Sequence, residues 1–140
     1  MAITKIHPST ISSTGATDGQ LLSFSTVNGV AFVDNTNYVQ LVRKGELSAV
    51  TGNARWYAPS AISISNVVAR VSTAPVGAAL SVDIKRNGVS NNIVTIADGG
   101  SEASNVTTIT ANEGDYFTID VLSVGSNTAG SDLHVIMKYT

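Results

Sequence analysis

The chain contains no cysteine. Disulfides, thiolate nucleophiles and zinc sites built from cysteine are therefore excluded, and the protein must be stabilised by packing or by oligomerisation. Only 13% of the 140 residues are charged, and the formal net charge is -2. So small a charge creates no field that attracts nucleic acid or an acidic membrane surface, and we expect neither partner.

Long apolar runs are also missing from the sequence. No stretch approaches the roughly 20 residues of a membrane span, so membrane insertion is not expected. The first residues, "MAITKIHPSTISS", lack the apolar core of a signal peptide. We therefore expect synthesis in the cytoplasm without an export signal.

Helical patterns are essentially absent, because no segment places apolar residues three and four apart between plausible caps. Ser, Thr, Asn and Gly occupy most polar positions instead, a composition typical of strands and turns. Alternating segments bounded by turn residues predict strands at residues 38–42, 47–50, 54–57, 62–71, 79–85, 92–97, 106–110, 116–124 and 133–139.

One stretch, "LSVDIKRNGVSNNIVTI", shows the pattern most clearly: two alternating segments flank a tight turn at Asn87-Gly88. Short strands at this spacing predict an all-β fold, an antiparallel β-sandwich of the jelly-roll type, over residues 36–140. We also expect a bulge near Asn66 to shift the register of its strand. Alternation predicts a core made of Ile62, Ile64, Val67, Val71, Leu80, Val82, Ile84, Phe117, Ile119, Val121, Val135 and Met137.

Residues 1–35 differ from the rest, and we expect them to form an extended N-terminal arm. Ile3, Ile6 and Ile11 stand among Ser, Thr and Lys without strand alternation, and such a segment cannot readily form its own core. Either the arm is flexible, or other copies of the chain bury its isoleucines. We favour the second interpretation, because leaving each isoleucine in water costs about 1.5–3 kcal/mol.

No catalytic constellation emerges from the titratable residues. His7 and His134 have no serine or acid at a spacing known from nucleophile motifs, so both are assigned surface or packing roles. Asp83 and Asp120 are placed on polar strand faces, and nothing in the sequence shows two carboxylates facing each other as in a glycosidase. We therefore predict no catalytic residue and no enzymatic activity.

A metal or cofactor site is not predicted either. The acidic residues of "ADGGSE" and "NEGD" could supply oxygen ligands, but their spacing is not that of a calcium loop, and turn formation explains them better. They are Asp98, Glu102, Glu113 and Asp115.

Trp56 and Tyr57 are adjacent, so in a strand they point to opposite faces. We expect Trp56 to pack in the core and Tyr57 to lie at the surface or an interface. If the protein binds glycan, the candidate contacts are Trp56 or Tyr57 together with the loop residues Asn91 and Asn92. "NVT" at Asn105 matches the glycosylation pattern, which we attribute to chance because no secretory signal is present.

Several of these turn and strand motifs recur in order in one known group of proteins. They are Arg55-Trp56-Tyr57, Ala74-Pro75-Val76-Gly77, "VDIKRNG", Gly114-Asp115 before "IDV", and Gly125-Ser126 followed by Gly130-Ser131-Asp132-Leu133. In this order, over residues 52–140, they resemble a β-sandwich domain that recurs in virion proteins of tailed bacteriophages, often near the C-terminus of tail fibres.

The segment "SSTGATDGQLLSFSTVNGVAF" also resembles a unit of phage fibre shafts, which an aromatic residue usually closes, as Phe32 does here. Fibres of this kind are homotrimers, so the resemblance implies self-association with Ile3, Ile6, Ile11 and Phe32 as candidate assembly contacts. A fibre normally has a long shaft, and this chain has almost none. The resemblance thus leaves room for a short tail-tip component.

The leading hypothesis is a phage structural protein, a short tail-fibre or tail-tip component that acts in assembly and host adhesion. Its partners would be other copies of itself, other virion proteins and a host-surface glycan, and its location the virion. A capsid decoration or cement protein, a carbohydrate-binding module and, last, a polysaccharide depolymerase are the alternatives.

Overall fold

A computed structural model describes residues 20–25, 29–34 and 36–140, with side chains described for residues 36–140. The chain divides into two units, residues 1–35 and 36–140. In the first unit, β1 (Gln20–Ser25) and β2 (Gly29–Asp34) form an antiparallel hairpin. Phe32 belongs to β2 and pairs with Leu22, whereas Ile3, Ile6 and Ile11 lie outside the described residues. Their assembly role stays a prediction.

The β1–β2 hairpin was not among the strands predicted from the sequence. Its first strand, "QLLSFS", places two leucines side by side and so lacks the alternation of a strand with one buried face. The pairing runs without interruption from Gln20↔Asp34 to Ser25↔Gly29. The β1–β2 hairpin is therefore recognised from its backbone pairing and not from an alternating sequence pattern.

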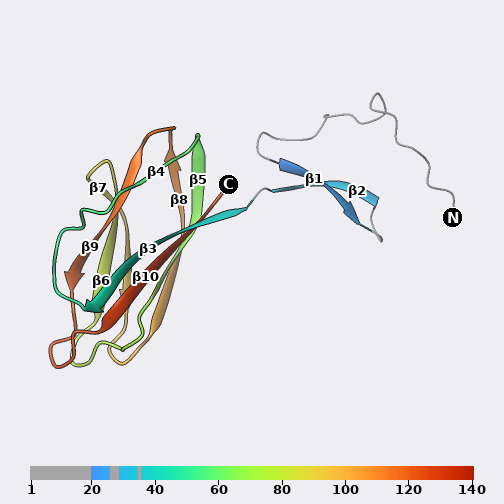
Figure 1. The fold of residues 1–140 in the computed structure, drawn as a ribbon. Helices are drawn as coiled ribbons and strands as arrows, with labels where there is room; N and C mark the ends of the chain where they lie inside the picture. Colours follow the sequence, from blue (N-terminus) through green and yellow to red (C-terminus); the bar gives the residue numbers. More distant parts are fainter. Residues whose placement is uncertain (1–19, 26–28, 35) are drawn as a thin grey trace. The chain divides into compact units, whose positions relative to one another are not determined.

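The second unit is a sandwich of two four-stranded antiparallel sheets (Figure 1). One sheet has the order β3-β10-β5-β8, and the other β4-β9-β6-β7. The strands are β3 (Asn37–Glu46), β4 (Trp56–Tyr57), β5 (Ile62–Arg70), β6 (Leu80–Arg86), β7 (Val89–Ile96), β8 (Glu102–Ala111), β9 (Tyr116–Ser123) and β10 (Ser131–Tyr139). The first and last strands of this unit pair, and every connection except the β6–β7 hairpin passes from one sheet to the other, which confirms the predicted jelly roll.

The core lies between the two sheets, and all twelve residues predicted to form it are buried. Alternation is interrupted within β5, as expected: Ile64 and Val67 both point inward although they are three residues apart. The pairing of β5 with β8 shifts between Ile64 and Asn66, so the bulge predicted near Asn66 is confirmed. The bulge keeps the apolar face of the long strand continuous.

The segment after β3 differs from the prediction. Residues 47–50 form no strand: Leu47 donates its N–H to the Gly130 carbonyl, and Val50 makes an isolated bridge with Val121 of β9. The chain here crosses from one sheet to the other, so it can pair only briefly. We call residues 47–55 the crossing segment.

Strand β3 continues past the predicted end at residue 42 and takes in the supposed turn "KGE". Gly45 has φ +83° and sits where the pairing of β3 with β10 is irregular, and its N–H donates to Asp132 Oδ1 at 2.9 Å. Glycine adopts this conformation without steric cost. A residue that normally marks a turn is therefore a bulge inside a strand.

The Asn87-Gly88 turn forms as the sequence predicts. Both residues have positive φ, +52° and +81°, which is the requirement of a two-residue hairpin turn. The Asn87 side chain also donates to Asp115 Oδ1 at 2.7 Å and accepts the Tyr116 N–H at 3.0 Å. The turn is thus tied to the start of β9.

Candidate functional site

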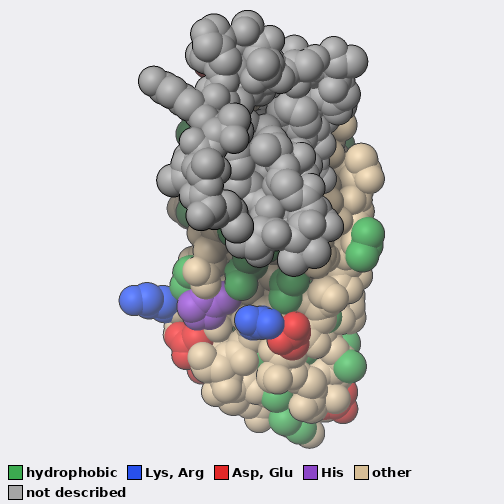
Figure 2. All heavy atoms as spheres, turned by 90° about the vertical axis from the view of Figure 1, so that its right-hand side faces the viewer, with side chains coloured by type: hydrophobic (Ala, Val, Ile, Leu, Met, Phe, Trp, Pro, Cys, Tyr) green, Lys and Arg blue, Asp and Glu red, His purple; other side chains and the backbone are tan. Residues whose placement is uncertain are grey.

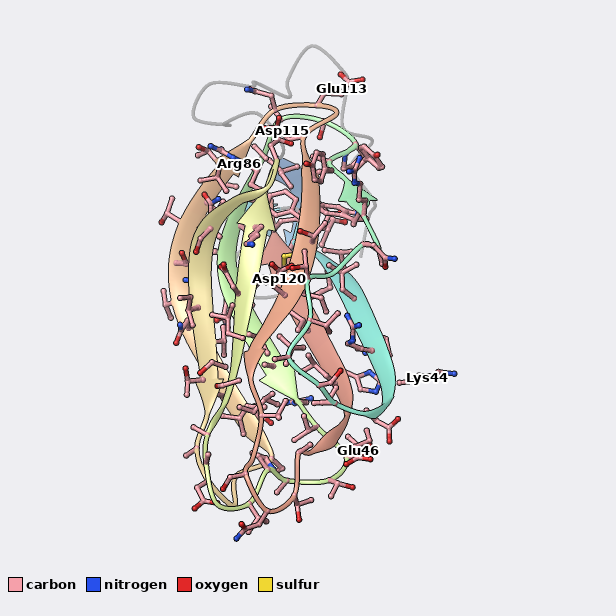
Figure 3. All side chains as sticks on the ribbon, turned by 90° about the vertical axis from the view of Figure 1, so that its left-hand side faces the viewer. Lys44, Glu46, Arg86, Glu113, Asp115 and Asp120 are labelled. Carbon is pink, nitrogen blue, oxygen red and sulfur yellow. The ribbon has the colours of Figure 1, made fainter. Side chains whose placement is uncertain are left out.

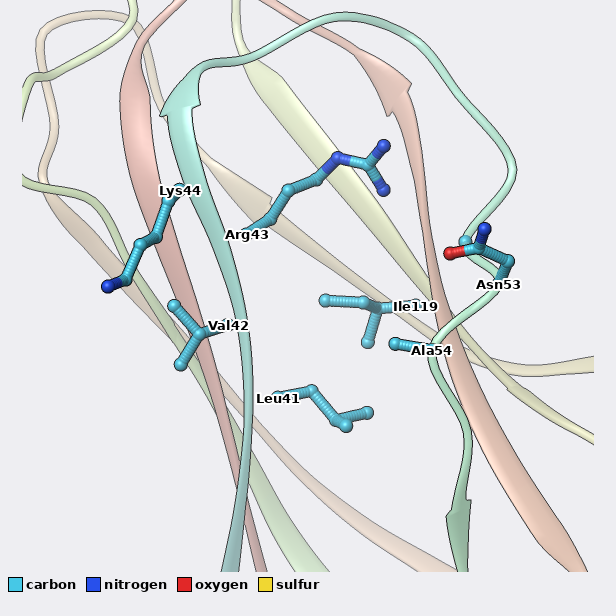
Figure 4. A pocket seen from close by; sticks show the side chains of 8 residues that line it. Leu41, Val42, Arg43, Lys44, Asn53, Ala54 and Ile119 are labelled. Carbon is cyan, nitrogen blue, oxygen red and sulfur yellow. The ribbon is translucent and has the colours of Figure 1, made fainter.

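A cavity of about 300 Å³ lies along the edge of the sandwich where β3 faces the crossing segment (Figure 4). The residues that line it are Leu41, Val42, Arg43, Lys44, Gly52, Asn53, Ala54 and Ile119. The Arg43 side chain extends across this groove toward the segment that carries Asn53, while Val42 and Lys44 point away from it. We call this feature the open-edge groove.

Arg43 occupies an inward position of β3, two residues after Leu41 and four after Val39 in the alternation of the strand. The residue is half-buried, yet within residues 36–140 its guanidinium has no hydrogen-bond acceptor and no ion pair. It still acts at a distance, because its charge helps to lower the pKa of Asp120. Arg43 therefore brings an unpaired cation into the groove.

Asp120 fixes the opposite wall of the groove. Its Oδ1 accepts the Gly52 N–H at 2.8 Å, and its Oδ2 accepts from Lys85 Nζ at 2.5 Å. Burial by itself raises the pKa of Asp120, but these hydrogen bonds and the charge of Lys85 outweigh it, so the pKa lies below its ordinary value. Each oxygen of the carboxylate thus has one bound donor.

Gly52 is needed for this close approach, because a Cβ atom there would lie 1.9 Å from the Ile119 carbonyl oxygen. Asp120 sits midway along the sandwich, whereas Arg86, Glu113 and Asp115 gather at one end and Lys44 and Glu46 lie toward the other (Figure 3). The Asp120 contact with Gly52 therefore anchors the crossing segment in the middle of its course over β9.

Asp83 and Asp120 were expected on polar strand faces, which would leave their side chains exposed to solvent. The structure shows that both are buried. They stand directly opposite each other on β6 and β9, and only 4% and 3% of their surfaces are exposed. Ser90 Oγ donates to Asp83 Oδ1 at 2.7 Å, and Lys85 serves Asp120. The two carboxylates are buried because their neighbours and the crossing segment cover the outer face of this sheet.

The opposite edge of the sandwich is closed. Asn105 of β8 donates its side-chain amide to the Ile93 carbonyl at 2.6 Å and to Asn92 Oδ1 at 3.3 Å, both on β7. These bonds join the edge strands of the two sheets. They also account for the asparagine of the "NVT" pattern, whose amide is engaged within the sandwich.

Trp56 and Tyr57 point to opposite faces of β4, as expected for adjacent strand residues. Trp56 is half-buried, with ring centroids 5.7 Å from Phe117 and 5.3 Å from Tyr139. Tyr57 is 54% exposed and lies 6.0 Å from the Tyr116 ring, over which the Arg55 guanidinium is stacked at 4.2 Å. Trp56 packs against the core, and Tyr57 is the one available at the surface.

The four candidate glycan contacts are not brought together. Trp56 and Tyr57 lie on β4 at one edge of their sheet, whereas Asn91 and Asn92 lie on β7 at the other edge. Three strand spacings separate these edges, about 14 Å. Asn91 is further engaged, since its amide donates to the Val89 carbonyl at 2.6 Å.

The acidic turn residues make local contacts. Asp98 Oδ1 accepts the Gly77 N–H at 2.8 Å, and Glu102 pairs with Arg70 at 2.8 Å. Hydrogen bonds from the Asn87 amide and the Asn112 N–H lower the pKa of Asp115. Among the residues that the structure describes, no group of three or more potential metal ligands is found, and no helix could span a membrane.

The outer face of the β3-β10-β5-β8 sheet carries exposed apolar side chains. Tyr38 is 65% exposed and Val42 44%, and a hollow of about 530 Å³ lies over Tyr38, Val39, Gln40, Val68, Arg70 and Ile136. Figure 2 looks onto this face, where hydrophobic side chains lie beside a histidine and charges of both signs. We call it the apolar sheet face.

Polar pairs border this face. His134 contacts the Gln40 side chain through a hydrogen bond, which gives it the surface packing role expected of it, while His7 lies outside the described residues. Four residues lie side by side across the sheet in the order Val42, His134, Arg70 and Glu102. Arg70 and Glu102 form an ion pair. Sequence analysis missed the face, although apolar residues at outward positions, Val42 and Ile136 among them, were a usable signal.

No protein-family model matches the chain, and no curated protein matches it. Among solved structures, the globular domain of zebrafish complement 1qA protein is similar, with a TM-score of 0.44 and 12% identity over 75% of this chain and 94% of that one. Carbohydrate-binding module CBM36 in complex with calcium and xylotriose has a TM-score of 0.36 and 15% identity over 87% and 88%. Neither similarity supports a functional statement about this chain.

Proposed function

We propose that this protein is a non-enzymatic structural component of a tailed-phage virion, a short tail-fibre or tail-tip protein that self-associates as a homotrimer and acts in assembly and host adhesion. The ordered motifs over residues 52–140 support the phage assignment, and the apolar sheet face carries the proposal of self-association. Jelly rolls serve many functions, viral capsid and lectin domains among them, so the fold is compatible with this role but does not select it.

The apolar sheet face supports self-association because exposed apolar surface rimmed by polar groups marks interaction sites. Gln40, Ile136 and Val68 lie side by side in one row across three strands. The Arg70–Glu102 ion pair lies in the neighbouring row, which also contains Val42. A rim with both signs of charge does not repel a second copy of itself. The occupant we propose is therefore another copy of this chain.

The connection to residues 1–35 adds to this argument. Tyr38, at the beginning of β3, follows residue 35 by three positions, so the predicted arm and the apolar sheet face are joined by a very short tether. Association through either part raises the effective concentration for the other. The two contributions would then act together in one trimer.

Light scattering on the full-length chain tests the assembly. The wild type should be a trimer, and Val42→Glu should lower the average mass by placing a charge on the apolar sheet face. Val89→Glu is the matched control, because Val89 is also exposed but lies on β7 of the other sheet. A monomeric wild type, or equal loss of mass in both variants, would contradict the assembly proposal.

The virion assignment needs a separate test. Antibody labelling of purified particles of the encoding phage, viewed by electron microscopy, should place the protein at the tail. Label on the capsid shell would favour a decoration or cement protein instead, and a protein that never copurifies with particles would point to a free carbohydrate-binding module.

The open-edge groove favours a carbohydrate-binding role as the second candidate function. It offers a cation, an amide side chain and an apolar floor within one cavity, a combination common to small-molecule sites. An adhesin also binds sugar, so this candidate does not exclude the first.

A further inference from the structure

We propose that the open-edge groove binds one acidic sugar residue of a surface glycan, with its carboxylate on Arg43. This inference deepens the proposed adhesion role and rests on it. Its starting point is that Arg43 reaches into a cavity without any acceptor among the described residues. A half-buried cation loses part of its hydration, and a ligand with a matching anion would restore these interactions.

Asp120, on the opposite wall, forms no ion pair with Arg43. Both oxygens of Asp120 are already bound, one by the Gly52 N–H and the other by Lys85. Arg43 therefore keeps its five N–H donors for a ligand, arranged in a planar fork that matches a carboxylate in bidentate geometry. Lys44 points away from the groove, so the site holds one fixed positive charge.

The rest of the groove suits a sugar ring better than a bare ion. Leu41, Ala54 and Ile119 supply apolar surface, and Asn53 supplies both a donor and an acceptor for hydroxyl groups. Near 300 Å³, the cavity lies at the small end of small-molecule sites, which span about 300–1,000 Å³. This size favours a single sugar residue, either at a chain end or projecting from a glycan.

Both walls of the groove hold their positions without a ligand. Arg43 pairs with Leu133 of β10, and Asn53 follows the glycine that Asp120 holds. Binding would therefore require little ordering of the protein, which favours affinity.

The test is titration of the full-length protein by nuclear magnetic resonance with methyl glucuronide, methyl glucoside and a sulfated methyl glucoside. Methyl glucuronide should shift resonances of Asn53 and Ala54, and the neutral glucoside should bind about tenfold or more weakly, since a charge-assisted hydrogen bond is lost. Equal binding of the neutral sugar would overturn the role of the carboxylate. Tighter binding of the sulfated sugar would overturn the choice of anion.

Three variants locate the site. Arg43→Lys keeps the charge but removes the fork, and we expect it to weaken methyl glucuronide binding about tenfold; Arg43→Gln should weaken it further. Arg55→Gln is the control, since Arg55 stacks on Tyr116 outside the groove and should bind as the wild type does. Unchanged binding by Arg43→Gln, with its melting temperature preserved, would overturn the proposal.

The failures can be told apart. If no sugar binds while the protein is a trimer located on the virion, the inference is wrong and the structural role stands. If methyl glucuronide binds but the protein never copurifies with particles, the groove is a sugar site and the virion assignment is wrong.

Discussion

The two long edges of the sandwich are built in opposite ways. At one edge, β7 and β8 are joined by the amide of Asn105, and these strands bury Ile96 and Ile109. At the other edge, the crossing segment stands in for a long strand, and a groove remains whose Arg43 has no ion pair within residues 36–140. The comparison shows that the candidate site arises where a connection, and not a strand, forms a wall of the sandwich.

The largest expected difference between the edges lies in their apolar side chains. Ile96→Ala removes a fully buried group at the closed edge and should lower the free energy of unfolding by about 2–5 kcal/mol. Leu41→Ala at the open edge should cost less, because Leu41 is only partly buried and lines the groove. Urea unfolding of both variants measures this, and equal losses would mean that the open edge is packed as tightly as the closed one.

Replacing the asparagine at each edge should give a smaller difference in the free energy of unfolding. Asn105→Ala should cost about 1 kcal/mol, since it removes the hydrogen bond to the Ile93 carbonyl. Asn53→Ala should stay within about 0.5 kcal/mol of the wild type, because within residues 36–140 its side chain has no hydrogen bond to lose. The same unfolding experiment decides, and a large loss for Asn53→Ala would show that it has a structural role.

Acid should act on the open edge through Asp120. Its pKa is lower in the folded than in the unfolded chain, so its contribution to stability is present above the unfolded value of about 3.9 and is lost as the pH falls through the folded value. Asp120→Asn removes this titration, and the free energy of unfolding should then fall less steeply between about pH 5 and 2. Parallel slopes for wild type and variant would contradict this account.

Much of the sandwich follows from the sequence because period-two alternation directly reports which side chains face the core. It identified Leu80, Val82 and Ile84, and it located the bulge near Asn66. The same alternation contained a signal that was not used: Arg43 follows Val39 and Leu41 at an inward position. An arginine in an apolar register is a candidate ligand-binding residue.

Other features could not be derived, because they depend on which distant strands become neighbours. Asp83 and Asp120 meet only because β6 pairs with β9, and Asn105 reaches Ile93 only because two edge strands face each other. Local patterns set the face of each residue but not the order of strands in a sheet. For the same reason the sequence could not show that Tyr57 and Asn92 lie at opposite edges.

The pairing of β3 with β10 also determines when the sandwich can form. The strand at the start of the second unit finds its partner only when residues 131–139 have left the ribosome, so the β3-β10-β5-β8 sheet cannot be completed before β10 has been made. The hairpin of β6 and β7, closed by Asn87-Gly88, needs only local contacts and can form earlier. Folding dominated by such distant pairing is slow, and until β10 arrives β3 and β5 expose strand edges that other nascent copies could pair with.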